Sequence, residues 1–437
     1  MATQVLEEAV HRDAGLKREI GVTAFAATIV NGVIGGGIFA APAALAGSVG
    51  AWAPFALLAC GIAMGAIVLC CAEAGSRVPS SGGIYAYVEA AFGRGWGFVT
   101  GIVLWLSCVL AAAGVAAAFA DAIVALWPTE APAVQRVLLL VGAFGLITAV
   151  NLRGVALGAR LASLSTVVKL VPLLLFIGVG AFFVEPANLR PAAGVDSGSF
   201  GRAMILALFA FSGMETVLGA SGEVARPERT VPRALVLAMG IVLLLYLAIQ
   251  IVAQGLLGAE LAGSAEPLAE AIGIASPGLV AVIAIGAALS RGGWLFSDVI
   301  GAPRILFAFA RDGLLPAPLG RLNGAHVPHV AILTHVSIAL TLALIGSFGS
   351  LVLLSGLFTV PIYLGACLSA VKLRRLDVRL IGEPYRVPGL IVAAAIGIVS
   401  MIALLAGGQW IEIGGLVAAI LVSGMIYLVR KDRSSRA

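Results

Sequence analysis

The sequence predicts an all-α membrane protein with 12 transmembrane helices. Three observations predict this class: 61% of the 437 residues are hydrophobic, only 11% are charged, and the mean hydropathy is +1.09. Soluble domains carry about 25% charged residues, so this chain has too few charges to cover a water-facing surface. The composition excludes a soluble enzyme, a secreted disulfide scaffold and a disordered protein. The apolar runs are continuous rather than alternating, which also excludes a membrane β-barrel.

Twelve apolar segments are long enough to cross a bilayer, which takes about 20 helical residues. The expected spans are 20–46, 51–72, 94–126, 134–153, 160–184, 200–222, 233–258, 277–310, 327–347, 350–371, 388–407 and 410–430. The first, third and eighth are long enough to be tilted or broken.

Loops that are rich in lysine and arginine alternate with loops that are poor in them along the sequence. With both termini in the cytoplasm, the inside segments hold 22 of the 27 basic residues and the outside segments hold three. The positive-inside rule therefore places both termini in the cytoplasm of a cell membrane, inner or plasma. The basic segment 372–386 is expected to anchor the chain on the anionic inner leaflet. No cleavable signal is expected, because the first 19 residues are polar.

Two spans carry residues that interrupt a helix. The first reads IVNGVIGGGIF and the sixth reads LFAFSGMETV, with Ser212 and Gly213 at its middle. Glycine is about 1 kcal/mol worse than alanine inside a helix, so three in a row favour unwinding. Close packing of helices through small residues is the alternative interpretation of both segments.

The two interrupted spans are five apart, which predicts two five-helix units. An odd number of spans per unit inverts the second unit relative to the first, and paired broken helices in such repeats frame a site near the bilayer midplane. Free amides there suit a carboxylate and free carbonyls suit an ammonium, so a zwitterion is the expected cargo of a secondary transporter. The expected organisation is a tail (1–19), the first repeat (20–184), the second inverted repeat (200–371), two peripheral helices (388–430) and a C-terminal tail (431–437).

Four stretches in this order resemble the amino acid–polyamine–organocation (APC) superfamily, whose amino acid permeases share the leucine-transporter-like fold. They are LKREIG with NGVIGGGIF (16–39), AEAGSRVPSSGGIYAYVEAAFGRGWGF (72–98), LFAFSGMETV with GEVARPERTVPRA (208–234) and APRILFAFARDGLLP (302–316). The resemblance implies alternating access, in which helices 1, 2, 6 and 7 move as a bundle against a scaffold of helices 3, 4, 8 and 9.

The resemblance also implies a substrate site at the two breaks. The backbone amides of Gly35, Gly36, Gly37 and Ile38 would bind the substrate carboxylate. The substrate amino group would be received by Ile34 and by the carbonyls of Phe209, Ala210 and Ser212, next to Gly213. Phe209 would also gate the site, and Ser297 and Asp298 correspond to substrate-facing positions of helix 8. Many family members carry Ser or Thr where Gly36 stands, so a side-chain contact is lost here while the backbone site remains.

Lys169 and Glu215 are candidate coupling residues, because a charge at mid-bilayer costs about 2.5–3.5 kcal/mol. Lys169 lies about 13 Å along its helix from Arg160. It either snorkels to the cytoplasmic side or places an ammonium where sodium-coupled relatives hold a cation. The second interpretation predicts a sodium-independent carrier, with Lys169 as the proton-coupling group or as a fixed cation. Glu215 is tied to proton dependence in relatives with a similar motif, or is a dipole partner of the helix start.

Arg291 and Asp298 lie seven residues apart in the eighth span, on one face but about 10 Å apart. Arg291 is expected in an ion pair with Glu215 or Asp298. Asp298 is alternatively a ligand for a cationic side chain or a second amine, whereas Arg291 alternatively favours an acidic substrate. These alternatives leave the side-chain specificity open.

Other reactive residue types are expected to be structural. The four histidines are expected at the surface or at helix ends, and the five cysteines as small packing residues; they are His11, His326, His329, His335, Cys60, Cys70, Cys71, Cys108 and Cys367. No metal site, cofactor or nucleic-acid partner is expected. The chain also lacks a phosphate-binding Gly-x-x-x-x-Gly-Lys loop, which argues against transport driven by ATP hydrolysis. It lacks a His-Glu-x-x-His motif as well, which argues against a membrane-embedded enzyme.

These observations predict a sodium-independent, proton-coupled symporter of L-amino acids in the lipid bilayer. An amino acid exchanger, or a polyamine or cationic amine transporter of the same fold, are the alternatives. A diamine carrier would require Asp298 and Glu215 to face the central site. The oligomeric state is left open.

Overall fold

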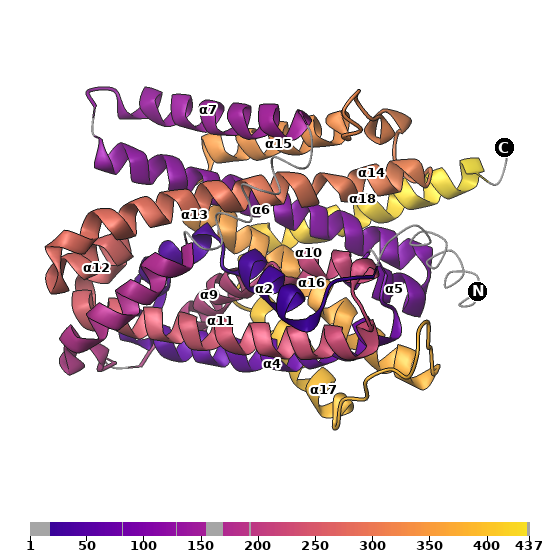
Figure 1. The fold of residues 1–437 in the computed structure, drawn as a ribbon, viewed down its shortest axis with the longest axis horizontal. Coiled ribbons are helices and arrows are strands. Elements are labelled where there is room, and N and C mark those ends of the chain that lie inside the picture. The colour runs from indigo at the N-terminus through magenta and orange to yellow at the C-terminus, as the bar shows by residue number, and fades with distance from the viewer. Residues whose placement is uncertain (1–17, 81, 128, 154–168, 192–193, 435–437) are drawn as a thin grey trace.

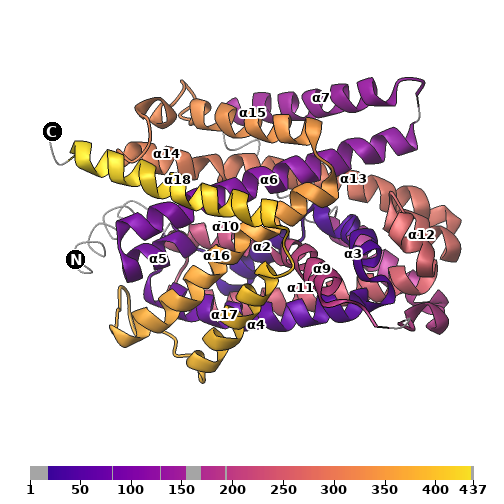
Figure 2. The same ribbon diagram turned by 180° about the vertical axis from the view of Figure 1, so that it is seen from behind.

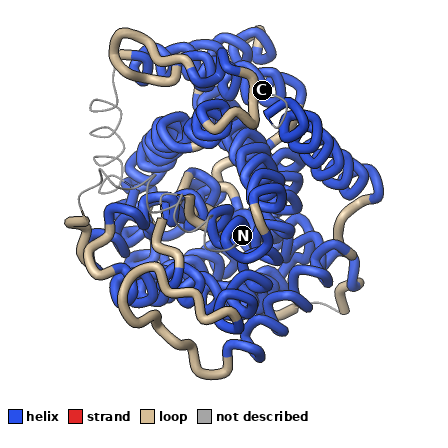
Figure 3. Tube along the Cα trace, turned by 90° about the vertical axis from the view of Figure 1, so that its right-hand side faces the viewer, coloured by secondary structure: helices blue, strands red, loops and turns tan. Residues whose placement is uncertain are grey.

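A computed structural model describes residues 18–80, 82–127, 129–153, 169–191 and 194–434. Helices and loops make up this part of the chain (Figures 1 and 3). A single β-bridge among the described residues joins Ile20 to Val224. Most long helices run along the long axis of the molecule (Figure 1).

The long helices are α4 (Ala53–Arg77), α6 (Arg94–Leu126), α7 (Pro132–Leu152), α11 (Pro227–Leu257), α13 (Val280–Gly301), α15 (His329–Ile345), α16 (Phe348–Arg375), α17 (Leu390–Leu405) and α18 (Trp410–Ser434). The shorter α-helices are α2 (Val22–Val33), α3 (Ala41–Val49), α5 (Ile84–Phe92), α9 (Ser197–Phe211), α10 (Met214–Val217), α12 (Pro267–Ala275) and α14 (Pro303–Arg311). One further apolar helix covers Lys169–Phe183.

Eight helical stretches of the described residues are long and apolar enough to cross a membrane. Four shorter apolar helices accompany them: Val22–Val33, Lys169–Phe183, His329–Ile345 and Leu390–Leu405. Every expected span overlaps one of these twelve elements, although residues 160–168 of the fifth lie outside the described part. The expectation of an all-α protein with several apolar helices is therefore confirmed.

Both expected helix interruptions are present. Helix α2 ends at Val33, and a short 3₁₀ turn (η1, Gly36–Phe39) separates it from α3. Helix α9 ends at Phe211 and α10 begins at Met214. Between them Ser212 is extended and Gly213 has φ +125°, a backbone conformation that side-chain-bearing residues rarely adopt.

The buried core forms where the long helices cross. Helix α16 packs along α6, and α11 packs along α4, while α2 lies against α11. Helices α7 and α15 pack together along one side of the molecule (Figure 1). Helices α17 and α18 lie on the outside, where α17 contacts α16 and α4 and α18 contacts α6 (Figure 2). Helix α12 lies at the opposite end of the molecule from α5 (Figure 1).

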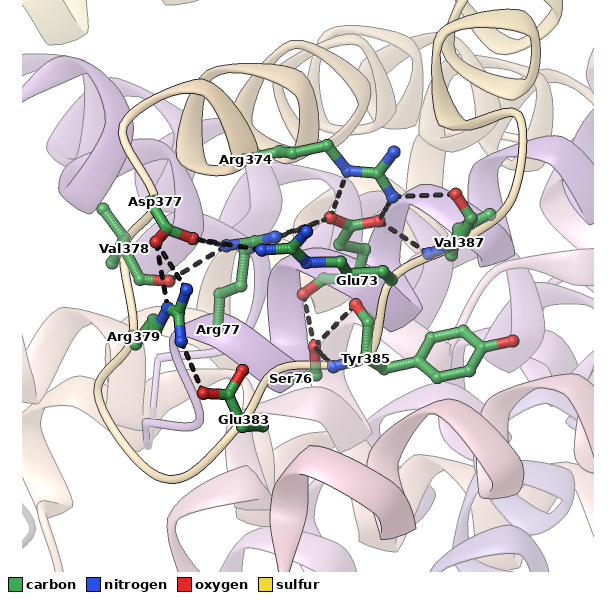
Figure 4. Close-up of polar contacts among 11 residues, drawn as sticks. Glu73, Ser76, Arg77, Arg374, Asp377, Val378, Arg379, Glu383, Tyr385 and Val387 are labelled. Atoms are coloured by element: carbon green, nitrogen blue, oxygen red, sulfur yellow. Dashed lines mark hydrogen bonds and ion pairs between the residues drawn. The ribbon is translucent and has the colours of Figure 1, made fainter.

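A buried charge cluster joins α4 to α16 and to the loop after α16 (Figure 4). The fully buried Glu73 carboxylate accepts hydrogen bonds from Arg77, from Arg374 and from the backbone amide of Val387. Arg77 also donates to the carbonyl of Val378 (3.2 Å). In the adjacent loop, hydrogen bonding from Arg379 lowers the pKa of Asp377. The cluster fixes the ends of two long helices that are about 300 residues apart in sequence.

Candidate functional site

The two helix interruptions meet at Gly32 and Gly213. A Cβ atom built on Gly213 would lie 2.5 Å from the Gly32 carbonyl oxygen, and one built on Gly32 would lie 2.6 Å from Val217. Such distances are shorter than any ordinary van der Waals contact, so glycine is required for this approach. The first and sixth spans therefore cross at their breaks.

A cavity of about 460 Å³ opens beside this crossing. Helices α6, α13 and α16 complete its wall with Ser107, Cys108, Trp294 and Ser355. The cavity brings together ten of the residues singled out in the sequence: Gly35, Gly37, Ile38, Phe209, Ala210, Ser212, Gly213, Glu215, Ser297 and Asp298. Ile34 and Lys169 are not among the described residues that line it.

Lys169 is buried under the end of α2. Its Nζ donates to the carbonyl of Asn31 (2.7 Å) and to the carbonyl of Ile34 (2.7 Å), and its exposed fraction is 1%. The last carbonyls of a helix lack intrahelical partners and carry the negative end of its dipole. The ammonium is therefore held at the helix break, and the snorkelling interpretation is wrong.

Two further side chains complete this set of donors. Trp294 Nε1 donates to the carbonyl of Gly32 (3.2 Å), and the Tyr246 hydroxyl donates to the carbonyl of Val33 (3.0 Å). All four carbonyls from Asn31 to Ile34 thus accept a side-chain hydrogen bond from another helix. Trp294 and Tyr246 could not be singled out from the sequence, because an aromatic residue in an apolar helix is not marked by charge or spacing.

The amides at the start of η1 face the same region. The Gly35 amide donates to the carbonyl of Val33 (2.7 Å), which leaves the amides of Gly36, Gly37 and Ile38 at the first positions of the turn. The Phe209 ring packs on the backbone here, since a Cβ atom on Gly37 would lie 2.8 Å from it. Gly37, Ile38 and Phe209 all line the cavity, next to the first break.

Glu215 joins the second break to α16. Its carboxylate accepts from the Gly213 amide (2.9 Å) and from the Tyr363 hydroxyl (2.7 Å). Glu215 is buried, with an exposed fraction of 5%. Both carboxylate oxygens are thus engaged, one of them at the start of α10.

The partners expected for Arg291 were wrong. Arg291 is buried and pairs with Glu266 (2.7 Å), which precedes α12, rather than with Glu215 or Asp298. The ion pair ties α13 to α12. Glu266 lies in the connection between two expected spans, so it was not among the charged residues expected inside the membrane.

The expectation that His335 lies at the surface was also wrong. His335 is on α15 with an exposed fraction of 0%, and its Nε2 lies 2.8 Å from Oδ2 of Asp298 on α13. The residues are 37 apart in sequence, and only the packing of α13 and α15 brings them together. His326 is exposed and His329 begins α15, as expected; His11 lies outside the described residues.

A second cavity, of about 750 Å³, continues from the first. Five residues line both cavities: Glu215, Thr216, Ile300, Gly301 and Ala302. The second cavity extends along α5 and α14 to Arg311 and His326. A path therefore leads from the helix breaks to the end of the molecule that carries these basic loops.

No metal-binding group appears in the described part of the chain, where no three His, Cys, Asp or Glu residues are placed to share an ion. The five cysteines are free and buried. Their expected role as packing residues is confirmed.

Comparison with known proteins identifies the family. The sequence model of the family described as amino acid permease matches residues 20–428. The chain belongs to the amino acid permease family. It is a multi-pass membrane protein, and the resemblance to the APC superfamily is confirmed.

Three relatives illustrate the range of similarity. The branched-chain amino acid permease BcaP of Bacillus subtilis is 26% identical, over 99% of this chain and 97% of its own. The serine/threonine exchanger SteT of the same organism is 30% identical over 77% of this chain and 78% of its own. An uncharacterized transporter of Mycobacterium tuberculosis is 34% identical over 70% of this chain and 69% of its own.

Proposed function

We propose that this permease is a secondary active transporter that moves L-amino acids across the cell membrane by alternating access, independently of sodium and coupled to protons. The observation that carries the proposal is the cavity at the crossing of two interrupted helices, with Gly35, Gly37 and Ile38 of the glycine-rich break on one wall. Family membership supports amino acids as the cargo.

The proposed architecture has twelve spans in a 5+5 inverted repeat with both termini in the cytoplasm. The positions of the two breaks support it, because α2 and α9 belong to spans five apart. The second cavity would then open towards the cytoplasm, since it reaches the basic loops around Arg311 and His326. The proposed conformation is therefore inward-facing.

In the proposed complex, the substrate carboxylate binds the amides of Gly36, Gly37 and Ile38. A short helical turn presents these N–H groups together, as anion sites at helix starts do. The substrate amino group binds the carbonyls around Phe209, Ala210 and Ser212, and the Phe209 ring covers the substrate as a gate. The Ile34 carbonyl already accepts from Lys169, so it is a secondary contact for the amino group.

Lys169 takes the place of a bound cation in this proposal. Its ammonium neutralises the carbonyl end of α2, which supports transport without sodium. When Lys169 is protonated, its ammonium would bind the carbonyls at the end of α2 and so hold α2 against the helix Lys169–Phe183. This arrangement supports proton coupling through Lys169, with Glu215 holding the second break.

Exchange of amino acids is the second candidate, because SteT is named as an exchanger. A polyamine carrier is less well supported. Asp298 and Glu215 both line the cavity, as a diamine would require, but both oxygens of Glu215 are already occupied by Gly213 and Tyr363.

Uptake into proteoliposomes tests the proposal. A panel of radiolabelled amino acids and diamines is presented with and without an inward proton gradient, to wild type and to Lys169→Ala. Accumulation driven by the gradient and lost in the variant supports proton-coupled symport. Uptake that requires internal substrate and ignores the gradient identifies an exchanger, and transport of diamines alone overturns the amino acid assignment.

A further inference from the structure

The wall of the central cavity offers few free side-chain donors, because its hydroxyl groups are bonded within the protein. Ser107 and Ser355 exchange hydrogen bonds with each other's carbonyls (3.0 and 2.9 Å). Ser212 donates to the carbonyl of Leu208 (2.9 Å), and Ser297 to that of Gly293 (3.2 Å). These hydroxyl groups therefore donate to backbone carbonyls of the helices and not to a ligand.

Asp298 contrasts with these residues because it presents an acceptor. One carboxylate oxygen, Oδ2, is held by His335, and no donor from the described residues is bonded to the other oxygen, Oδ1. Asp298 lines the cavity one helical turn beyond Trp294, whose ring lies against the first break at Gly35. A carboxylate this deeply buried is costly unless it receives hydrogen bonds, so the open oxygen calls for a donor.

His335 fixes the direction of that carboxylate. The imidazole is fully buried, and its Nδ1 has no partner among the described residues. A proton on Nδ1 would bury an unpaired N–H, which favours the tautomer with its proton on Nε2. The ring then donates to Oδ2, and Oδ1 of Asp298 remains an acceptor towards the cavity.

We infer that Asp298, positioned by His335, selects amino acids whose side chain donates a hydrogen bond, and that threonine is preferred over its isostere valine. This inference rests on the proposed function and names its substrate class. A site built to bond a hydroxyl discriminates strongly against an analogue that lacks it, because the buried acceptor is then left unpaired. The same chemistry admits a cationic donor, which 2,4-diaminobutyrate represents.

The experiment measures initial uptake rates of threonine, valine and 2,4-diaminobutyrate by the full chain in proteoliposomes, as KM and kcat for each. We expect wild type to prefer a donor-bearing substrate over valine by about tenfold or more, the usual scale for a hydrogen bond to a charged acceptor. Asp298→Leu and His335→Phe should reduce this preference to below about threefold, mainly through KM for the donor-bearing substrate. His335→Gln, whose amide can donate to Oδ2, should recover part of the preference.

The control is His329→Phe, which changes the same residue type at the start of α15, away from Asp298. It should leave the threonine-to-valine ratio unchanged. If a single variant fails to fold, Asp298→Leu combined with His335→Phe replaces the polar pair by apolar side chains, a change that buried pairs often tolerate.

The uptake rates separate the possible outcomes. Preference for threonine identifies a neutral donor, and preference for diaminobutyrate identifies a cationic one; either supports the inference. Equal uptake of all three substrates by wild type overturns it, as does an unchanged ratio in the variants that lack the Asp298–His335 bond. If no amino acid is transported, the proposed function itself fails.

Discussion

The backbone of Gly213 lies so close to Gly32 that a Cβ atom added to Gly213 would be 2.5 Å from the Gly32 carbonyl oxygen. This approach depends on glycine at position 213, which also has φ +125°, whereas a Cβ atom added to Gly32 would meet the side chain of Val217. Because the Gly213 amide donates to Glu215 (2.9 Å), the same residue links the crossing to the side-chain network of α16. A change at Gly213 therefore acts on both breaks at once.

Gly213→Ala should destabilise the protein and abolish transport. The added methyl group would overlap the Gly32 carbonyl, and the backbone conformation alone costs about 1–3 kcal/mol for a residue with a side chain. Thermal unfolding of the purified protein, followed with uptake in proteoliposomes, measures both effects. Gly240→Ala is the matched control, because Gly240 lies inside α11 with no atom within 4 Å of its added Cβ. A Gly213→Ala variant as stable and active as Gly240→Ala would contradict the crossing described here.

Lys169→Met should unfold at a lower temperature than wild type. The substitution keeps an unbranched side chain but leaves the carbonyls of Asn31 and Ile34 without their donor, at about 1–3 kcal/mol for a buried unsatisfied group. If the ammonium stands in for a cation, sodium should raise the melting temperature of a Lys169→Ala variant and leave that of wild type unchanged. Lys372→Met serves as control, because Lys372 packs over the Phe92 ring outside the cavity. A sodium response that is equal in wild type and variant would exclude the surrogate-cation role.

The sequence predicted the helices and their breaks because both are local properties. Apolar runs of about 20 residues mark membrane helices, and the glycines around Gly36 mark a segment where a helix is costly. The position of Lys169 was also predictable in part, because a lone charge inside an apolar run must find acceptors. The carbonyls of Asn31 and Ile34 are those acceptors.

The side-chain partners could not be predicted, because they depend on which helix faces come together. His335 resembles a helix-end residue in the sequence, yet the packing of α15 on α13 places it on Asp298. The sequence favoured Glu215 or Asp298 as the partner of Arg291, but its partner Glu266 lies outside the apolar runs. Tyr246 and Trp294 carry donors without charge, so their bonds to the first break are visible only in three dimensions.

Asp196 at the start of α9 should make stability depend on acid pH. Its carboxylate accepts from the Ser199 side chain and from the amides of Ser199 and Gly198, and these bonds lower its pKa below the usual value. A lowered native pKa means that the cap stabilises the fold above the unfolded-state pKa, and that this contribution is lost as pH falls through the native value. Asp196→Asn keeps a capping side chain that does not titrate. We expect the melting temperature of wild type to fall relative to Asp196→Asn below about pH 4; parallel curves for the two proteins would show that the cap does not contribute.

Glu73→Gln should be among the most destabilising conservative changes in the chain. The substitution keeps the size of the side chain but leaves the fully buried Arg77 with only the half-exposed Asp377 carboxylate, 3.7 Å away, and it weakens the contacts from Arg374 and from the Val387 amide (Figure 4). Removing one partner of a buried ion pair costs about 3–5 kcal/mol. Denaturation of the purified protein, compared with wild type, measures the loss.

Glu383→Gln is the matched control for this cluster. Glu383 pairs with Arg379 in the same loop, but its side chain is 81% exposed, so its loss should cost no more than about 1 kcal/mol. Combining Glu73→Gln with Arg77→Gln removes the uncompensated buried charge and should recover part of the stability. The role of the cluster as the connection between α4 and α16 predicts that transport and stability fall together in Glu73→Gln. Loss of transport at full stability would instead indicate a direct role of Glu73 in the transport cycle.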